Sequence, residues 1–159
     1  MARTTGKDHC ERKVIDDIAQ FGWHCVHIIA EGSKGPYSFT VGLFETYRHP
    51  ELIIFGLPSK VAHQILCIAA DQAKCGNPID LSQPTSALLN DYSCCFAEVS
   101  NTHYDNYVGY CIWYYEGKTF PLHQVIWPSR ARLYPWHPEA SVEFRETQPV
   151  IAESASQTH

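Results

Sequence analysis

The run His49-Pro50-Glu51 concentrates side chains capable of acid–base chemistry within three residues. An imidazole and a carboxylate held close together can transfer protons to and from a bound molecule, as general acid–base catalysis requires. Pro50 favours an extended backbone at His49, so that the imidazole can project from a loop. We therefore predict His49 and Glu51 as catalytic residues. In the alternative interpretation, His49 only holds its loop through hydrogen bonds to the backbone.

A second group of residues has the chemistry to bind an anionic, planar ligand. Small hydroxylated side chains leave room beside a strand, and the free N–H groups at the start of a helix attract anions. Tryptophan rings stack on planar molecules, and arginine pairs with phosphate or carboxylate. The predicted ligand-binding residues are Ser38, Thr40, Ser59, Lys60, His63, Trp127, Arg130 and Arg132. Core packing and ordinary surface exposure are the alternative explanations for these residues.

The run His24-Cys25-Val26-His27 contains metal-binding residue types. On a strand, Cys25 and His27 share a face, whereas His24 and His27 point to opposite faces. Two ligands are too few for zinc, and their spacing does not specify a third. The further ligands would have to come from His49, His63, His103 or His123. We predict no metal site, although a metal-dependent or Cys/His hydrolase stays as an alternative function.

Composition limits the class of protein. The chain has 159 residues, 45% of them hydrophobic and 18% charged, which predicts one folded domain with a full core. The N-terminus has no apolar signal segment and no apolar run is long enough to span a membrane, so we expect a cytoplasmic protein. A net charge of -5 makes nucleic acid an unfavourable partner. The seven cysteines contain no CxxC pair and are expected to be reduced.

Hydrophobic periodicity predicts the elements that position these residues. Alternation over residues 37–43 indicates a strand, and the apolar run 52–55 indicates a central one. Residues 59–75 have the period of a helix, with Ser59 as the predicted N-cap and Gly76 as the stop. Residues 23–30 should pair antiparallel with the strand at 37–43.

The remaining segments complete an α+β pattern. We predict helices over residues 8–20 and 104–116, of which the second is rich in Tyr and Trp, and strands over 93–99 and 120–127. Residues 77–92 should be an irregular connection. The result is a single α+β domain over residues 1–152, with a mixed or antiparallel sheet of about five strands and two or three packing helices. Residues 153–159 are predicted to form a disordered tail.

Several short motifs occur in a characteristic order along the chain. They are Gly22-Trp-His, Phe39-Thr-Val-Gly-Leu, His49-Pro-Glu-Leu, Phe55-Gly-Leu-Pro, Ala62-His63, Gly109-Tyr110, Trp113-Tyr-Tyr and Gln124-Val-Ile-Trp-Pro128. Together they resemble the bacterial family labelled domain of unknown function 4262, from about residue 18 to residue 136. This resemblance implies membership of a family but brings no activity with it.

The order of the elements is also similar to the flavin-reductase-like split barrels, which bind FMN. That resemblance implies a split barrel as an alternative to an ordinary α+β sheet, and FMN as a ligand. Our first functional hypothesis is a small-ligand-binding protein that takes a flavin or a nucleotide, with redox use. The second is a non-catalytic interaction or immunity-type factor, because the chain is rich in aromatic residues. A homodimer is a further expectation.

Overall fold

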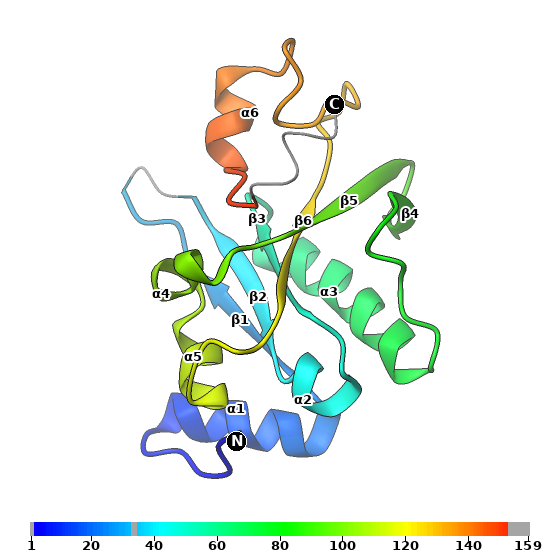
Figure 1. Cartoon of the computed structure of the whole chain (residues 1–159). Helices are drawn as coiled ribbons and strands as arrows, with labels where there is room; N and C mark the ends of the chain where they lie inside the picture. The colour runs from blue at the N-terminus through cyan, green and yellow to red at the C-terminus, as the bar shows by residue number, and fades with distance from the viewer. Residues whose placement is uncertain (1, 33–34, 153–159) are drawn as a thin grey trace.

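Six strands form one mixed sheet at the centre of the fold (Figure 1). The computed structural model describes residues 2–32 and 35–152. The predicted disordered tail at 153–159 lies outside the described residues. The strands are β1 (His24–Ile28), β2 (Tyr37–Val41), β3 (Glu51–Phe55), β4 (Thr85–Leu89), β5 (Tyr92–Glu98) and β6 (Leu122–Ile126). Their spatial order is β1-β2-β3-β6-β5-β4.

The sheet is antiparallel except at its middle. β1 pairs with β2 and β2 with β3 in antiparallel register, β3 and β6 are parallel, and β5 pairs antiparallel with both β6 and β4. The expected pairing of the first two strands is confirmed, with His27 opposite Ser38. Among the described strands, β1 and β4 form the two edges, so the sheet is open. The α+β prediction is confirmed, and the split-barrel alternative is not shown.

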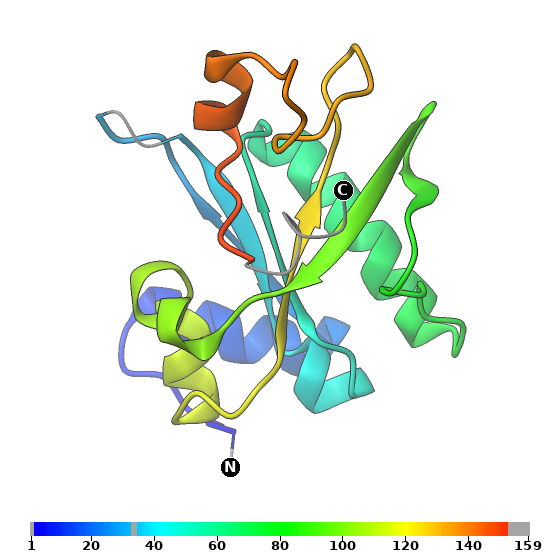
Figure 2. The ribbon, with the colours of Figure 1, turned by 45° about the horizontal axis from the view of Figure 1, so that its top comes forward.

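Helices cover both faces of this sheet. They are α1 (His9–Phe21), α2 (Leu43–Tyr47), α3 (Ser59–Lys74), α4 (Tyr104–Tyr107), α5 (Gly109–Tyr115) and α6 (Val142–Thr147), with a 3-10 helix η1 (Asn101–His103) before α4. Helix α3 packs on one face, where Leu66 joins Leu52 and Ile54 in one hydrophobic cluster. The helices α1, α4 and α5 lie on the other side of the β1–β2–β3 part (Figure 2), with Val14 and Cys111 in the second cluster.

The C-terminal segment is attached to β6 by two buried glutamines. The Gln148 side chain accepts from the backbone N–H of Trp127 and donates to its carbonyl, at 2.9 and 2.7 Å. The Gln124 side chain donates to the carbonyl of Pro149 and accepts from the N–H of Ile151. Both side chains are fully buried, and these bonds satisfy the polar groups that burial would otherwise leave unpaired.

Four local predictions were wrong. Leu43 was expected at the end of a strand but begins helix α2, and β4 lies within the segment expected to be irregular. The aromatic helix is broken at Val108, which has non-helical backbone angles. Ser59 is the first residue of α3, while Pro58 occupies the N-cap position without a side-chain bond. Among the described helices, none is long and apolar enough to cross a membrane.

Candidate functional site

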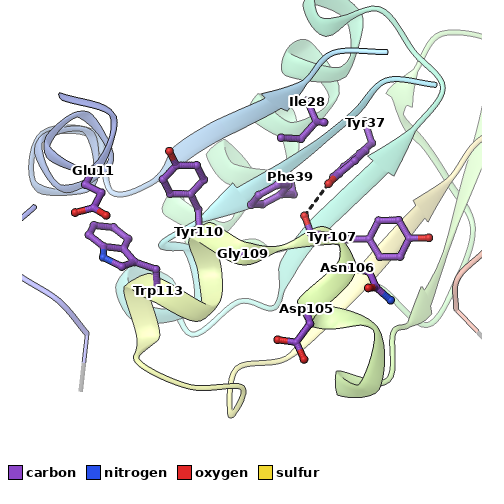
Figure 3. A pocket seen from close by; sticks show the side chains of 10 residues that line it. All are labelled: Glu11, Ile28, Tyr37, Phe39, Asp105, Asn106, Tyr107, Gly109, Tyr110 and Trp113. Atoms are coloured by element: carbon purple, nitrogen blue, oxygen red, sulfur yellow. Dashed lines mark hydrogen bonds between the residues drawn. The ribbon is translucent and has the colours of Figure 1, made fainter. Parts of the chain in front are cut away.

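Two adjoining hollows on the face of β1 and β2 opposite α3 form an aromatic groove. The first has a volume of about 410 Å³ (Figure 3) and is lined by Glu11, Ile28, Tyr37, Phe39, Asp105, Asn106, Tyr107, Gly109, Tyr110 and Trp113. The second, of about 550 Å³, is lined by Ile28, Ile29, Glu31, Gly35, Pro36, Tyr37, Phe55, Asn106, Tyr107, Glu146, Thr147 and Pro149. The two hollows adjoin, because they share the lining residues Ile28, Tyr37, Asn106 and Tyr107. We use the name aromatic groove for their combined lining.

The floor of the aromatic groove belongs to the sheet. Tyr37 and Phe39 alternate along β2, so both rings point to the same face, and Ile28 lies opposite Tyr37 in the β1–β2 pairing. The two rings stack with centroids 6.1 Å apart. The Tyr37 ring also contacts the ring of Phe55 on β3, with centroids 5.2 Å apart. Phe39 and Phe55 are almost fully buried, so Tyr37 is the partly exposed ring of this floor.

The wall comes from the broken aromatic helix. The break at Val108 ends α4 and starts α5, so that Tyr107 and Tyr110 face the groove from separate helices. Tyr110 contacts Trp113 edge-on, with ring centroids 6.3 Å apart. The Tyr37 hydroxyl donates to the Tyr107 carbonyl at 3.0 Å, which joins floor to wall (Figure 3).

Gly109 leaves part of this wall open. A Cβ atom built on it would have no heavy atom within 4 Å outside its own local backbone, so the space there is open, and Gly109 lines the first hollow. Its φ is outside the left-handed region, and a side chain is therefore compatible with this backbone.

The charge around the groove is mainly acidic. Glu11 and Asp105 border the first hollow, and Glu31 and Glu146 border the second. Among the described residues that line the hollows there is no Lys or Arg. Cations lie just outside, where Lys118 pairs with Asp105 and the guanidinium of Arg3 lies 5.4 Å from the Trp113 ring centroid. This field favours neutral or cationic ligands over phosphates.

Burial raises the pKa of the Tyr37 and Tyr110 hydroxyls above the ordinary value for tyrosine. Both phenols are therefore neutral at physiological pH, with hydroxyl groups that donate as well as accept. Among the described lining residues there is no Cys or His. The chemistry of this site is that of stacking and hydrogen bonding, which suits binding.

The predicted catalytic residues lie elsewhere. Glu51 is fully buried, and its carboxylate accepts from the Thr40 hydroxyl at 2.6 Å and from the Gly42 N–H at 2.9 Å. The N–H groups of Leu43 and Phe44 and the hydroxyl of Tyr115 also donate to it. Glu51 thus satisfies the free N–H groups at the start of α2. Burial raises the pKa of this carboxyl, although its hydrogen bonds oppose that rise.

His49 is also enclosed, with 5% of its surface exposed. Its Nδ1–H donates to the Pro50 carbonyl at 2.7 Å, while its Nε2 has no hydrogen-bond partner among the described residues. On the neighbouring strand β6, the Nδ1 of His123 is also buried and has no hydrogen-bond partner among the described residues. Burial lowers the pKa of both imidazoles, so they are neutral at physiological pH.

The predicted ligand-binding residues are dispersed. Ser59 and Lys60 are exposed at the start of α3, and Arg130 and Arg132 are exposed near β6. Trp127 donates from its indole N–H to the Phe55 carbonyl. Of these residues, Ser38 and His63 both contact His27. The His27 Nδ1 forms a hydrogen bond with the Ser38 hydroxyl, and the ring centroids of His27 and His63 are 5.7 Å apart.

The aromatic groove was not predicted as a site. Its wall was visible in the sequence as a helix with surplus Tyr and Trp, for which stacking on a planar ring was one interpretation. Glu11 and Asn106 gave no signal, because they reach the groove from segments far apart in the chain. Its floor residues were assigned to the core, which is confirmed for Phe39, while Tyr37 is only partly buried against that core.

Comparison with known proteins places the chain in a family. The family model described as domain of unknown function (DUF4262) matches residues 17–141, and the chain belongs to this family. No curated protein and no solved structure matches it.

Proposed function

We propose that this member of the domain of unknown function 4262 family binds a small planar molecule in the aromatic groove. The observation that carries the proposal is the position of the Tyr37 ring beside the Tyr107–Trp113 wall, where two adjoining hollows have volumes of about 410 and 550 Å³. These volumes are in the range of small-molecule sites, and aromatic faces attract planar rings.

The charge of the groove narrows the class of ligand. A phosphate would meet Glu31 and Glu146 in one hollow or Glu11 in the other. We therefore favour a neutral or cationic heteroaromatic ring. Among flavins, the uncharged riboflavin satisfies this condition better than FMN, whose phosphate would have to extend into solvent. Redox use would then come from the flavin, since the lining residues supply contacts alone.

The test is a binding titration of riboflavin and FMN, followed by the fluorescence of the flavin and by the melting temperature. We expect riboflavin to bind and to raise the melting temperature more than FMN does. Gly109→Phe should abolish binding, because its ring would occupy the open space in front of the wall. Trp113→Leu should weaken binding by about fivefold, since one stacking contact contributes about 1 kcal/mol.

Trp136→Leu is the matched control for Trp113→Leu. Trp136 stacks on Tyr134 with centroids 5.1 Å apart and is not among the groove residues, so its loss should leave the affinity unchanged. Equal losses in the two variants, or binding unaffected by Gly109→Phe, would contradict the location of the site. No shift of the melting temperature with either flavin would exclude flavins as the ligand.

Protein interaction through the same groove is a second candidate. Ile29 borders the second hollow and is 82% exposed, which is unusual for a large apolar side chain. A homodimer would cover it. Light scattering should then give a mass of two chains, and Ile29→Ser should return the mass to that of one chain. A single-chain mass for the unaltered protein would contradict this candidate.

A further inference from the structure

Three metal-binding side chains meet on the face of β1 that is turned away from the aromatic groove. Cys25 and His27 are two residues apart on β1, and His63 lies in the second turn of α3. One potential ligand atom from each residue lies within 4.8 Å of the other two. We propose that Cys25, His27 and His63 bind a zinc ion.

This site is independent of the groove. Ile28 lines the groove, and the adjacent residue His27 points to the other face because side chains alternate along a strand. The sequence placed Cys25 and His27 on one face of a strand, but two ligands were too few and no metal site was predicted. The packing of α3 across β1 selects His63 among the candidate histidines.

His27 is oriented for metal binding by a hydrogen bond. Its Nδ1 pairs with the buried hydroxyl of Ser38 at 2.7 Å, so its Nε2 is the nitrogen left for a ligand bond. That Nε2 lies 3.5 Å from the Cys25 sulfur. Histidines that bind metals commonly use their second ring nitrogen in this way, which fixes the orientation of the ring. Ser38 is thus a positioning residue for the site.

The spacing of the three ligand atoms is close to that of a zinc site. Bond lengths of about 2.0 to 2.3 Å in a tetrahedral site place its ligand atoms about 3.5 Å apart. The Cys25–His27 pair already meets this distance. His63 is exposed and stacks on Trp23 with centroids 6.2 Å apart, so a small rotation can bring its ring closer.

The donor types favour zinc over the hard cations. One sulfur and two imidazole nitrogens form a mixed set that suits Zn²⁺, whereas Mg²⁺ and Ca²⁺ prefer oxygen. Binding replaces the proton of the Cys25 thiol by the metal, and that proton is released to solvent. Three protein ligands leave a fourth position for water, as in sites where zinc acts on a substrate.

The site is accessible from a neighbouring hollow. A hollow of about 420 Å³ is lined in part by Trp23, Cys25, His63 and Cys67. Cys67 lies one turn after His63 on α3, but the residues whose ligand atoms meet are Cys25, His27 and His63. We therefore assign a single thiolate to the site.

Co²⁺ is a suitable probe, because a cobalt–thiolate bond gives a charge-transfer absorption band. The full chain is treated with a chelator under reducing conditions and titrated with Co²⁺ and then with Zn²⁺. We expect one Co²⁺ per chain with a thiolate band that Zn²⁺ removes. Cys25→Ser should abolish the band, and His63→Gln should weaken Co²⁺ binding at least tenfold. Ser38→Ala should weaken it by about tenfold, as removal of an orienting hydrogen bond does.

Cys67→Ser and Cys75→Ser are the controls, and both should keep the band. Cys75 is exposed at the end of α3, away from the three ligands. The absence of a thiolate band in the unaltered chain would overturn the proposal, and so would a band that survives Cys25→Ser. Loss of the band in Cys67→Ser would overturn the assignment of Cys25 as the single thiolate. His63→Gln gives an independent test if Cys25→Ser does not fold, since His63 is exposed.

Discussion

The hydroxyl of Tyr37 donates a hydrogen bond of 3.0 Å to the backbone carbonyl of Tyr107, a residue 70 positions further along the chain. Tyr37 belongs to strand β2, and Tyr107 is the last residue of α4, just before the break at Val108. The two rings also meet edge-on, with centroids 5.7 Å apart. The Tyr37 side chain therefore links the floor and the wall of the aromatic groove, beside the edge contact of Phe55 with Tyr107.

Tyr37→Phe should lower the free energy of unfolding by about 1 kcal/mol, because it removes this hydrogen bond and keeps the ring. Urea denaturation measures the change. Tyr47→Phe is the matched control, since the Tyr47 hydroxyl makes only a long, exposed bond of 3.4 Å to the Phe21 carbonyl. If Tyr47→Phe lowers the free energy of unfolding as much as Tyr37→Phe does, the hydrogen bond to Tyr107 contributes no more to stability than the exposed bond of Tyr47.

Glu51 organises the opposite end of β2. Its carboxylate accepts from Thr40 and Tyr115 and from three backbone N–H groups at the start of α2. Glu51→Gln keeps the size of the side chain but turns an amide NH₂ toward some of these donors. We expect a loss of about 2 to 4 kcal/mol of unfolding free energy, the range for buried networks left with unpaired groups. Glu45→Gln, on the exposed part of the same helix, should change it little in the same denaturation experiment.

The same carboxylate should make stability depend on pH. Burial raises the pKa of Glu51 in the folded chain above the ordinary value of 4.5. A folded state that holds a proton more tightly than the unfolded state loses stability as the pH rises. The contribution is complete below pH 4.5 and declines as the pH rises through the raised pKa.

The measurement compares the unaltered chain with Glu51→Gln, which cannot titrate at this position, by denaturation across that pH range. The advantage of the unaltered chain over Glu51→Gln should shrink as the pH rises. An advantage that grows with pH would show that the five hydrogen bonds outweigh burial and hold the pKa below its ordinary value.

The large elements could be predicted because their signals are local. The alternation in β2, the apolar run of β3 and the helical period of α3 each follow from the faces that these segments bury. The antiparallel pairing of β1 with β2 was predicted from two neighbouring segments. The shared face of Cys25 and His27 was predicted from the alternation of side chains along a strand. In each case, one segment of sequence or two neighbouring segments contain the whole pattern.

What could not be predicted depends on contacts between distant segments. Helix α2 has five residues, too few to be stable alone, and Glu51 of the following strand supplies the acceptors for its N–H groups. The aromatic groove arises where α4 and α5 meet β1 and β2. The position of His63, the third ligand of the proposed zinc site, is fixed by the packing of α3. No spacing within a single segment encodes these relationships.

His49 is another residue whose surroundings could not be predicted from its own segment of sequence. The neighbours Pro50 and Glu51 favoured a catalytic residue that projects from a loop, yet the His49 side chain is 5% exposed. We now expect His49→Ala to lower the free energy of unfolding by about 2 kcal/mol, through a cavity and the lost bond to Pro50. His137→Ala, at a more exposed loop position, is the control in the same thermal melts. A His49→Ala variant as stable as the unaltered chain would contradict the interpretation that His49 holds its loop.

Gly56 and Gly76 allow the destabilisation caused by backbone strain to be measured apart from that caused by a steric clash. Both have positive φ, 86° and 80°, which disfavours any other residue. A Cβ at Gly76 would meet no atom within 4 Å, whereas one at Gly56 would lie 2.5 Å from the backbone oxygen of Thr147, the last residue of α6. Gly76→Ala should therefore lower the free energy of unfolding by about 1 to 2 kcal/mol, through backbone strain alone.

Gly56→Ala should cost about 1 to 3 kcal/mol more than Gly76→Ala, because α6 must also move away from the end of β3. Denaturation of both variants measures this difference directly, since the strain at the two glycines is similar. Thr147 also borders the second hollow of the groove, so Gly56→Ala should weaken ligand binding there, while Gly76→Ala should not. Equal costs for the two substitutions would mean that the C-terminal segment yields freely and that its contact with Gly56 does not hold it on the sheet.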